Sequence, residues 1–214
     1  MNSRSRILIA DDHTLVAELC QRLLEAEFNV IGIVGDGRAL VQSAIELRPD
    51  VIVLDVVLPI LNGLDAGRQI KKILPAVKLV YLTMNGDDRV AAEAFAHGAS
   101  GYLLETCAAS EMVSAVREVL RGKTYLSNTL SRARIDRLRW QHGEQVTNEK
   151  RLTHRQREVL QLLAEGKVMK EVGGILNVTP RTIAFHKYRM MEILGAKNSV
   201  DLFRYAVRNH IVAG

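Results

Sequence analysis

Short apolar runs alternate with one-sided helical patterns over the first 122 residues of the chain. The runs are rich in valine, isoleucine and leucine, which is typical of strands that are buried on both faces of a parallel sheet. The predicted strands are Arg6–Ala10, Val30–Val34, Val51–Asp55, Lys78–Met84 and Ser100–Leu104, and the predicted helices are Leu15–Ala26, Ala39–Leu47, Leu64–Ile73, Arg89–Ala96 and Glu111–Arg121.

Turn-forming residues separate these segments, among them Pro49-Asp50, Asn62-Gly63 and His97-Gly98. Five alternating strand and helix units predict an α/β fold, in which helices cover both faces of a five-stranded parallel sheet. We expect this doubly wound, flavodoxin-like domain to span residues 1–124.

The remaining chain shows only helical patterns. Residues 125–150 are polar and rich in arginine, and we expect a linker that contains one helix, near Ser131–His142. Beyond it, Thr153 begins a capping-box sequence, Thr179-Pro180 favours a helix start, and Gly195 favours a helix end. Residues 151–214 are therefore predicted to form an all-α, four-helix domain of the helix-turn-helix kind.

Charge divides along the same boundary. Residues 1–122 hold 12 Lys+Arg and 16 Asp+Glu, whereas residues 123–214 hold 17 and 8, so that net charges of −4 and +9 give the whole-chain +5. A basic second half beside an acidic first half indicates that the second half meets a polyanion such as DNA.

The composition also bears on the compartment. The chain has two cysteines, Cys20 and Cys107, which is too few for a disulfide framework. Its longest apolar stretch, from Val51 to Leu61, is interrupted by Asp55 and Pro59, so no transmembrane helix is expected. With no signal-peptide pattern at the start, we expect a cytoplasmic protein.

Three carboxylates follow or end two of the predicted strands. Asp11 and Asp12 follow the first strand, and Asp55 ends the third. Open α/β sheets place their sites at this edge, where Asp11, Asp12 and Asp55 could hold Mg²⁺ and Asp55 could accept a phosphoryl group. Thr83, which lies near the end of the next strand, offers a hydroxyl to a phosphoryl oxygen. His13 and His186 are interpreted as structural residues rather than ligands.

Residues 6 to 121 resemble the receiver domain of two-component response regulators. The matching residues are Asp11-Asp12, Asp55 with Pro59 and Gly63, Thr83, and Gly98-Ala99-Ser100-Gly101-Tyr102. The resemblance implies that Asp55 is the phosphoacceptor, that Mg²⁺ binds beside it, that Tyr102 is a switch aromatic, and that a sensor histidine kinase is a possible partner.

Residues 152 to 208 resemble a LuxR-type helix-turn-helix domain, on the stretches Leu152-Thr153, Glu158-Val159-Leu160, Glu165-Gly166-Lys167, Lys170-Glu171 and Thr182-Ile183 with His186. This domain order is similar to that of the NarL/FixJ class of transcription factors, which implies a DNA-binding regulator rather than an enzyme. The expected contacts to double-stranded DNA are Lys170, Arg181, Thr182, Ala184, Phe185, Lys187, Tyr188 and Arg189. A homodimer is expected to form through Leu202, Tyr205 and Asn209.

One position departs from the receiver pattern. The resemblance implies a lysine after the last strand, where it pairs with the phosphoryl group, but this chain has Glu105. A glutamate opposes added negative charge unless a cation intervenes. An orphan regulator that acts without phosphorylation is therefore an alternative.

Two other functions remain open alternatives. Aspartyl-phosphate phosphatases also use a nucleophile at the end of a strand, but they need a general acid two residues later, where this chain has Val57. A receiver coupled to a domain that binds RNA or another protein is the second, and the lack of interleaved aromatic residues argues against single-stranded RNA.

Overall fold

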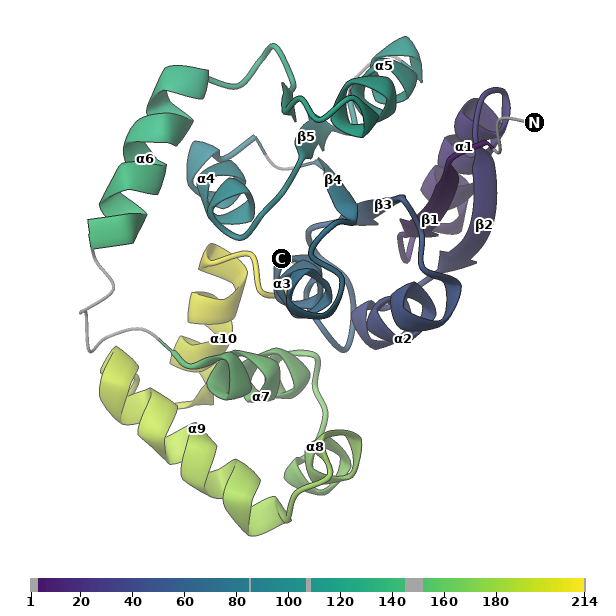
Figure 1. The fold of residues 1–214 in the computed structure, drawn as a ribbon. Coiled ribbons are helices and arrows are strands. Elements are labelled where there is room, and N and C mark those ends of the chain that lie inside the picture. Colours follow the sequence, from purple (N-terminus) through teal and green to yellow (C-terminus); the bar gives the residue numbers. More distant parts are fainter. Residues whose placement is uncertain (1–3, 85, 107–108, 145–151, 214) are drawn as a thin grey trace.

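A computed structural model describes residues 4–84, 86–106, 109–144 and 152–213. A six-stranded parallel sheet with the order β2-β1-β3-β4-β5-β6 is followed by a helical domain (Figure 1). The strands are β1 Arg6–Ala10, β2 Asn29–Val34, β3 Val51–Asp55, β4 Lys78–Thr83, β5 Gly101–Leu104 and β6 Tyr125–Leu126. The helices are α1 Thr14–Glu25, α2 Gly37–Leu47, α3 Gly63–Ile73, α4 Asp88–Ala96, α5 Ala109–Leu120, α6 Arg132–Glu144, α7 His154–Ala164, α8 Met169–Leu176, α9 Pro180–Leu194 and α10 Ser199–Arg208.

The flavodoxin-like fold is confirmed, but the predicted count of five strands was one short. The sixth strand, β6, pairs in parallel with β5, and Gly101 faces Tyr125 while Tyr102 faces Leu126. Two residues are too few to show a periodic pattern, so sequence periodicity had no means of finding this strand. The sheet therefore extends into the segment that was predicted to be linker.

Two apolar layers hold the sheet between its helices. One face packs side chains such as Leu8, Ile52 and Leu54 against α2, α3 and α4, and the other packs Ile7 and Val53 against α1 and α5. All five residues of β3 are buried, as expected for a strand near the middle of a doubly wound sheet.

The loop between β3 and α3 is tightly constrained. A Cβ at Gly63 would lie 1.9 Å from the Asp55 carbonyl oxygen, so only glycine fits there. The Asn62 side chain caps α3 by accepting a hydrogen bond from the Leu64 backbone N–H at 3.0 Å. The end of the loop that follows Asp55 is therefore constrained at both Asn62 and Gly63.

The C-terminal domain is the predicted group of four helices. Thr153 and Gln156 form the capping box of α7, Thr179 caps α9, and Gly195 ends α9 in the left-handed region. Asn177, at φ +53°, makes the tight turn between α8 and α9. The linker helix α6 lies close to its predicted position and packs on α4.

The helical domain contacts the receiver-like domain in this structure. In Figure 1, α7 lies beside α3, while α9 is on the outer side of the helical domain. Within the described residues, none of the helices is long and apolar enough to cross a bilayer.

Candidate functional site

Three neighbouring parallel strands bring the predicted site residues to one edge of the sheet. Register pairs Ala10 of β1 with Leu54 of β3, so Asp11 emerges beside Asp55. Asp55 is 8% exposed, Asp11 is 5% exposed, and Thr83, at the end of β4, is buried. The predicted convergence of Asp11 and Asp55 at the strand ends is therefore present.

Burial and the charge of Asp11 together disfavour the ionised form of Asp55. Burial, followed by the charge of Asp11, raises the pKa of Asp55 to about 7, although backbone N–H groups of Val57 and Val56 act in the opposite direction. Burial also raises the pKa of Asp11, against hydrogen bonding from His13. A cation or an added proton would relieve this repulsion.

Oxygen ligands for a cation are available here. Ligand atoms of Asp11, Asp12 and His13 lie within 4.8 Å of one another, and His13 Nδ1 is 3.2 Å from Asp12 Oδ1. Asp55 is not in this group, whereas His13, which the sequence favoured as a structural residue rather than a ligand, lies beside the two carboxylates. Two carboxylates, of which Asp11 is buried with a raised pKa, fit the preference of Mg²⁺ for one or two carboxylates and several waters.

Thr83 and Tyr102 form a pair across adjacent strands. Tyr102 is fully buried in β5, and its side chain is hydrogen bonded to that of Thr83, while burial raises the pKa of the phenol. The rings of Tyr102 and Tyr81 lie 6.4 Å apart. A change at the Thr83 hydroxyl would therefore reach a buried aromatic side chain directly.

Glu105 lies at the rim of the same site. Its backbone N–H donates to the Thr83 carbonyl at 2.9 Å, and the residue is half-buried. Burial and the charge of Asp11 raise the Glu105 pKa, and Glu105 in turn contributes to the raised pKa of Asp55. This position thus adds negative charge to a site that is already acidic.

The predicted DNA-reading residues lie on α8 and α9. Four of them, Arg181, Phe185, Tyr188 and Arg189, are exposed on α9, and Phe185 and Tyr188 are 66% and 63% exposed. Lys170 on α8 is exposed, whereas Thr182, Ala184 and Lys187 are half-buried. Exposed aromatic rings between arginines on a helix are suited to a groove that is lined by phosphates.

The predicted dimer residues are less uniform. Leu202 is 3% exposed and belongs to the core of its own domain, so it is not available to a partner. Tyr205 is half-buried, and Asn209 donates to the Tyr205 carbonyl at 2.8 Å. The exposed apolar residues of α10 are instead Val200 and Phe203, which the sequence pattern did not single out.

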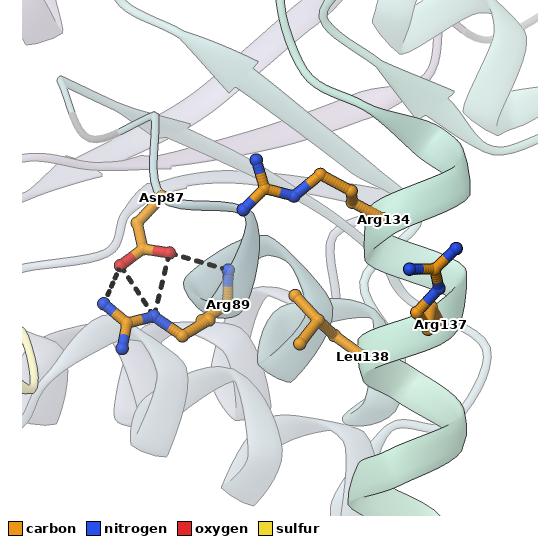
Figure 2. A pocket seen from close by; sticks show the side chains of 5 residues that line it. All are labelled: Asp87, Arg89, Arg134, Arg137 and Leu138. Carbon is orange, nitrogen blue, oxygen red and sulfur yellow. Dashed lines mark hydrogen bonds and ion pairs between the residues drawn. The ribbon is translucent and has the colours of Figure 1, made fainter.

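A cavity of about 540 Å³ lies apart from these residues, between α4 and α6 (Figure 2). Its lining consists of Asp87, Arg89, Arg134, Arg137 and Leu138. Arg89 donates to both carboxylate oxygens of Asp87, and Arg134 Nε lies 3.2 Å from Asp88 Oδ2. Two of the three arginines in the lining, Arg89 and Arg134, are therefore paired with carboxylates.

Comparison with known proteins gives the two domains their family. Residues 7–117 match the response regulator receiver domain, and residues 150–206 match bacterial regulatory proteins of the luxR family. The transcriptional regulatory protein LiaR of Bacillus subtilis (strain 168) is 36% identical over 209 residues, which cover 97% of this chain and 99% of LiaR.

Solved structures agree with this match over the length of the chain. The RcsB response regulator of Salmonella typhimurium is 26% identical with a TM-score of 0.64, and the match covers 95% of this chain and 96% of the other. A structure of two RcsB dimers bound to two parallel DNAs is 27% identical, with a TM-score of 0.57 and coverage of 95% and 98%. The chain belongs to the NarL/FixJ-type family of DNA-binding transcriptional response regulators.

Proposed function

We propose that Asp55 is the phosphoacceptor of this regulator and that its state controls promoter binding by α8 and α9. The observation that carries the proposal is the pairing of a buried Asp55 with Asp11 at adjacent strand ends, beside the Thr83 hydroxyl. Of the site residues, Asp55 has the position and the chemistry of the nucleophile.

In phosphoryl transfer to Asp55, the protein mainly positions the reacting groups and stabilises their charge. An Asp55 carboxylate oxygen forms a bond to phosphorus as the bond from phosphorus to the donor's leaving group breaks. Mg²⁺, held by Asp11 and Asp12 with Asp55, would offset the charge on the phosphoryl oxygens. Thr83 donates its hydroxyl to a phosphoryl oxygen, and because the Thr83 side chain is also hydrogen bonded to Tyr102, its reorientation acts on that buried ring.

The output is recognition of double-stranded DNA by a homodimer. Arg181, Lys187, Arg189 and Lys170 contact phosphates, while Phe185 and Tyr188 reach the groove. Neither aromatic side chain can make the bidentate contact by which arginine selects guanine, so readout depends on thymine methyl groups and DNA shape. The RcsB dimers on DNA support a paired arrangement, in which Val200 and Phe203 of α10 offer the exposed apolar surface.

Labelling and DNA binding test the proposal together. The protein and an Asp55→Asn variant are incubated with acetyl phosphate and Mg²⁺, modification is followed by intact mass, and gel shifts use genomic fragments. We expect Asp55-dependent modification that changes fragment binding. Modification of the Asp55→Asn variant to the same extent would contradict the assignment of the acceptor.

A second candidate rests on Glu105. Because Glu105 adds to the negative field at Asp55, we also consider a regulator that works with little or no phosphorylation. A DNA-binding response that is identical with and without phosphodonor favours this candidate, whereas rapid and near-complete modification of Asp55 excludes it.

Two contextual expectations accompany the proposal. A sensor histidine kinase is the expected phosphodonor, and the cytoplasm, where such kinases and DNA are both accessible, is the expected compartment. Phosphatase turnover is disfavoured, since Val57 offers no general acid near Asp55.

A further inference from the structure

A charged contact joins the two domains in a place that solvent hardly reaches. Arg157 of α7 has a side chain that is only 17% exposed, and its Nε lies 3.1 Å from Asp65 Oδ2 at the start of α3. Its Nη1 lies 3.4 Å from Glu93 Oε1 of α4, so one guanidinium connects two helices of the receiver. A charge in such a position is favourable only while its partners remain in place.

Hydrogen bonds from side chains of the helical domain to loop backbone groups extend this contact into the loop that follows Asp55. The Asn62 N–H donates to Gln161 Oε1 at 2.6 Å, and Gln161 Nε2 donates to the Leu58 carbonyl at 2.8 Å. The Ile60 N–H donates to Glu165 Oε1 at 2.9 Å, with Ile60 held at φ +67°. Side chains of α7 and of its C-terminal cap thus bind backbone groups of the loop.

The C-terminal end of the chain contributes as well. The Asn62 side-chain amide donates to the carbonyl oxygens of His210 at 2.8 Å and Ile211 at 3.2 Å. Gln69 of α3 donates to Glu158 at 3.0 Å, and Arg38 Nη2 lies 3.6 Å from the same carboxylate. In the helical domain these contacts come from α7 and from the segment that follows α10.

The DNA-reading helix takes no part in these contacts. Phe185 and Tyr188 remain about two thirds exposed, and none of the interdomain hydrogen bonds or ion pairs of the described residues involves α9. Closure of the two domains therefore restrains the orientation of the helical domain without covering its reading surface.

We propose that Arg157 is an interdomain latch, which holds the helical domain closed on the receiver through Asp65 and Glu93 while α9 stays uncovered. The latch concerns the resting chain and holds whether or not phosphate is the input. The loop that begins directly after Asp55 leads into α3, so a rearrangement of this loop moves Asp65 and the backbone groups that Gln161 and Glu165 bind.

A double-mutant cycle on the full-length chain tests this proposal. The variants are Arg157→Gln, Asp65→Asn and their combination, and the control is Arg204→Gln, which removes a charge from an exposed arginine of α10. Small-angle scattering without phosphodonor measures the radius of gyration. We expect each single change to enlarge the radius, the double change to add nothing further, and the control to match the unmodified chain.

Binding to a random-sequence DNA duplex provides the second readout. Arg157→Gln and Arg204→Gln each remove one positive charge, so equal affinities are expected if α9 is already open in the closed chain. Tighter binding by Arg157→Gln than by Arg204→Gln would show that closure masks the DNA surface and would overturn this part of the proposal. An unchanged radius in both single variants, which lie in different domains, with native circular dichroism, would overturn the latch itself. Neither readout depends on Asp55 modification, so failure of the proposed phosphorylation would be seen separately.

Discussion

At the scale of single residues, the acidic site combines burial with repulsion. Asp11 and Asp55 are nearly inaccessible, and Glu105 adds a third carboxylate at the rim. Such a site stabilises whatever brings positive charge or removes negative charge, and it opposes folding when all its members are ionised.

The raised pKa of Asp55 predicts a pH-dependent stability. Its folded-state pKa of about 7 exceeds the ordinary aspartate pKa of 3.8 expected for the unfolded chain, so the folded state binds more protons between these values. Stability from this group is therefore complete below about pH 4 and is lost as pH rises through 7. In EDTA, Asp55→Asn should raise the stability at pH 8 by on the order of 2 to 4 kcal/mol.

Urea denaturation at pH 5 and pH 8 measures this difference. The gain from Asp55→Asn should shrink at pH 5, where wild-type Asp55 is largely protonated. Equal gains at both values would mean that titration of Asp55 is not their source.

The negative charge of Glu105 predicts how a substitution at this position changes the rate of Asp55 modification. Glu105→Lys replaces a carboxylate that opposes charge at Asp55 with a cation that favours it, so modification by acetyl phosphate should become faster. Glu105→Gln only removes the negative charge, so its rate of modification should lie between those of the unmodified chain and Glu105→Lys. The ordering of initial rates by intact mass is the measurement, and a Gln variant as fast as Lys would show that neutralisation alone suffices.

Sequence reasoning found Asp11, Asp55 and Thr83 because parallel strands end at one edge, and a carboxylate or hydroxyl at that end is visible in the pattern. The pattern did not predict the proximity of His13 to two carboxylates, since that proximity depends on side-chain direction after the strand. It also placed Leu202 at a partner surface, because helical periodicity alone cannot say which of two neighbouring faces is the core.

At the scale of elements, helix ends could be predicted from local capping residues, whereas a very short strand could not be predicted. Thr153, Thr179 and Gly195 marked helix ends that the structure confirms, since caps and left-handed turns are local. The two-residue β6 escaped because it is defined only by its pairing with β5.

Two adjacent glycines in α8 predict opposite effects on stability. A Cβ at Gly173 would lie 2.7 Å from the Val178 carbonyl oxygen, which is backbone and cannot move aside, whereas a Cβ at Gly174 meets nothing within 4 Å. Gly173→Ala should destabilise the chain by roughly 1 to 3 kcal/mol. Gly174→Ala should stabilise it by up to about 1 kcal/mol, since glycine is a poor helix former.

Thermal unfolding of the two glycine variants provides a matched comparison. Because both changes add the same methyl group one residue apart, differences in composition cancel. A stabilised Gly173→Ala variant would mean that the α8–α9 turn is not closely packed in solution.

Lys187 on α9 predicts a uniform loss of DNA affinity. A phosphate contact carries no base information, so Lys187→Ala should weaken binding to all duplexes alike and lower the salt slope by about 1. Affinities for several unrelated duplexes over a series of salt concentrations measure this. A loss confined to one base position would place Lys187 at a base edge instead.

At the scale of the whole molecule, the domain contact was outside the reach of sequence patterns. The contact residues are Arg157 and Gln161 of α7 and its C-terminal cap, Glu165. The apolar periodicity of α7 explains the core of its own domain. Nothing local in the sequence indicates that the opposite face meets a second domain. Asp65 and Gln161 are buried in the closed chain, and each has a partner across the domain contact, so these pairings are a tertiary property.

The same contact predicts a local change in hydrogen exchange. The Asn62 N–H donates to Gln161 and the Ile60 N–H to Glu165, so protection of these two amides depends on domain closure rather than on the sheet. Gln161→Leu leaves the Asn62 N–H and the Leu58 carbonyl without partners in the closed state, which costs about 1 to 3 kcal/mol for each buried group and favours opening. Exchange mass spectrometry should therefore show faster exchange of the 58–62 segment in Gln161→Leu, while residues 79–82 of β4 stay protected.

The control is Gln42→Leu on the exposed surface of α2, which should exchange like the unmodified chain. If Gln161→Leu leaves the 58–62 segment as slow as before, the loop is held by the receiver alone, and the closed arrangement is not what protects it.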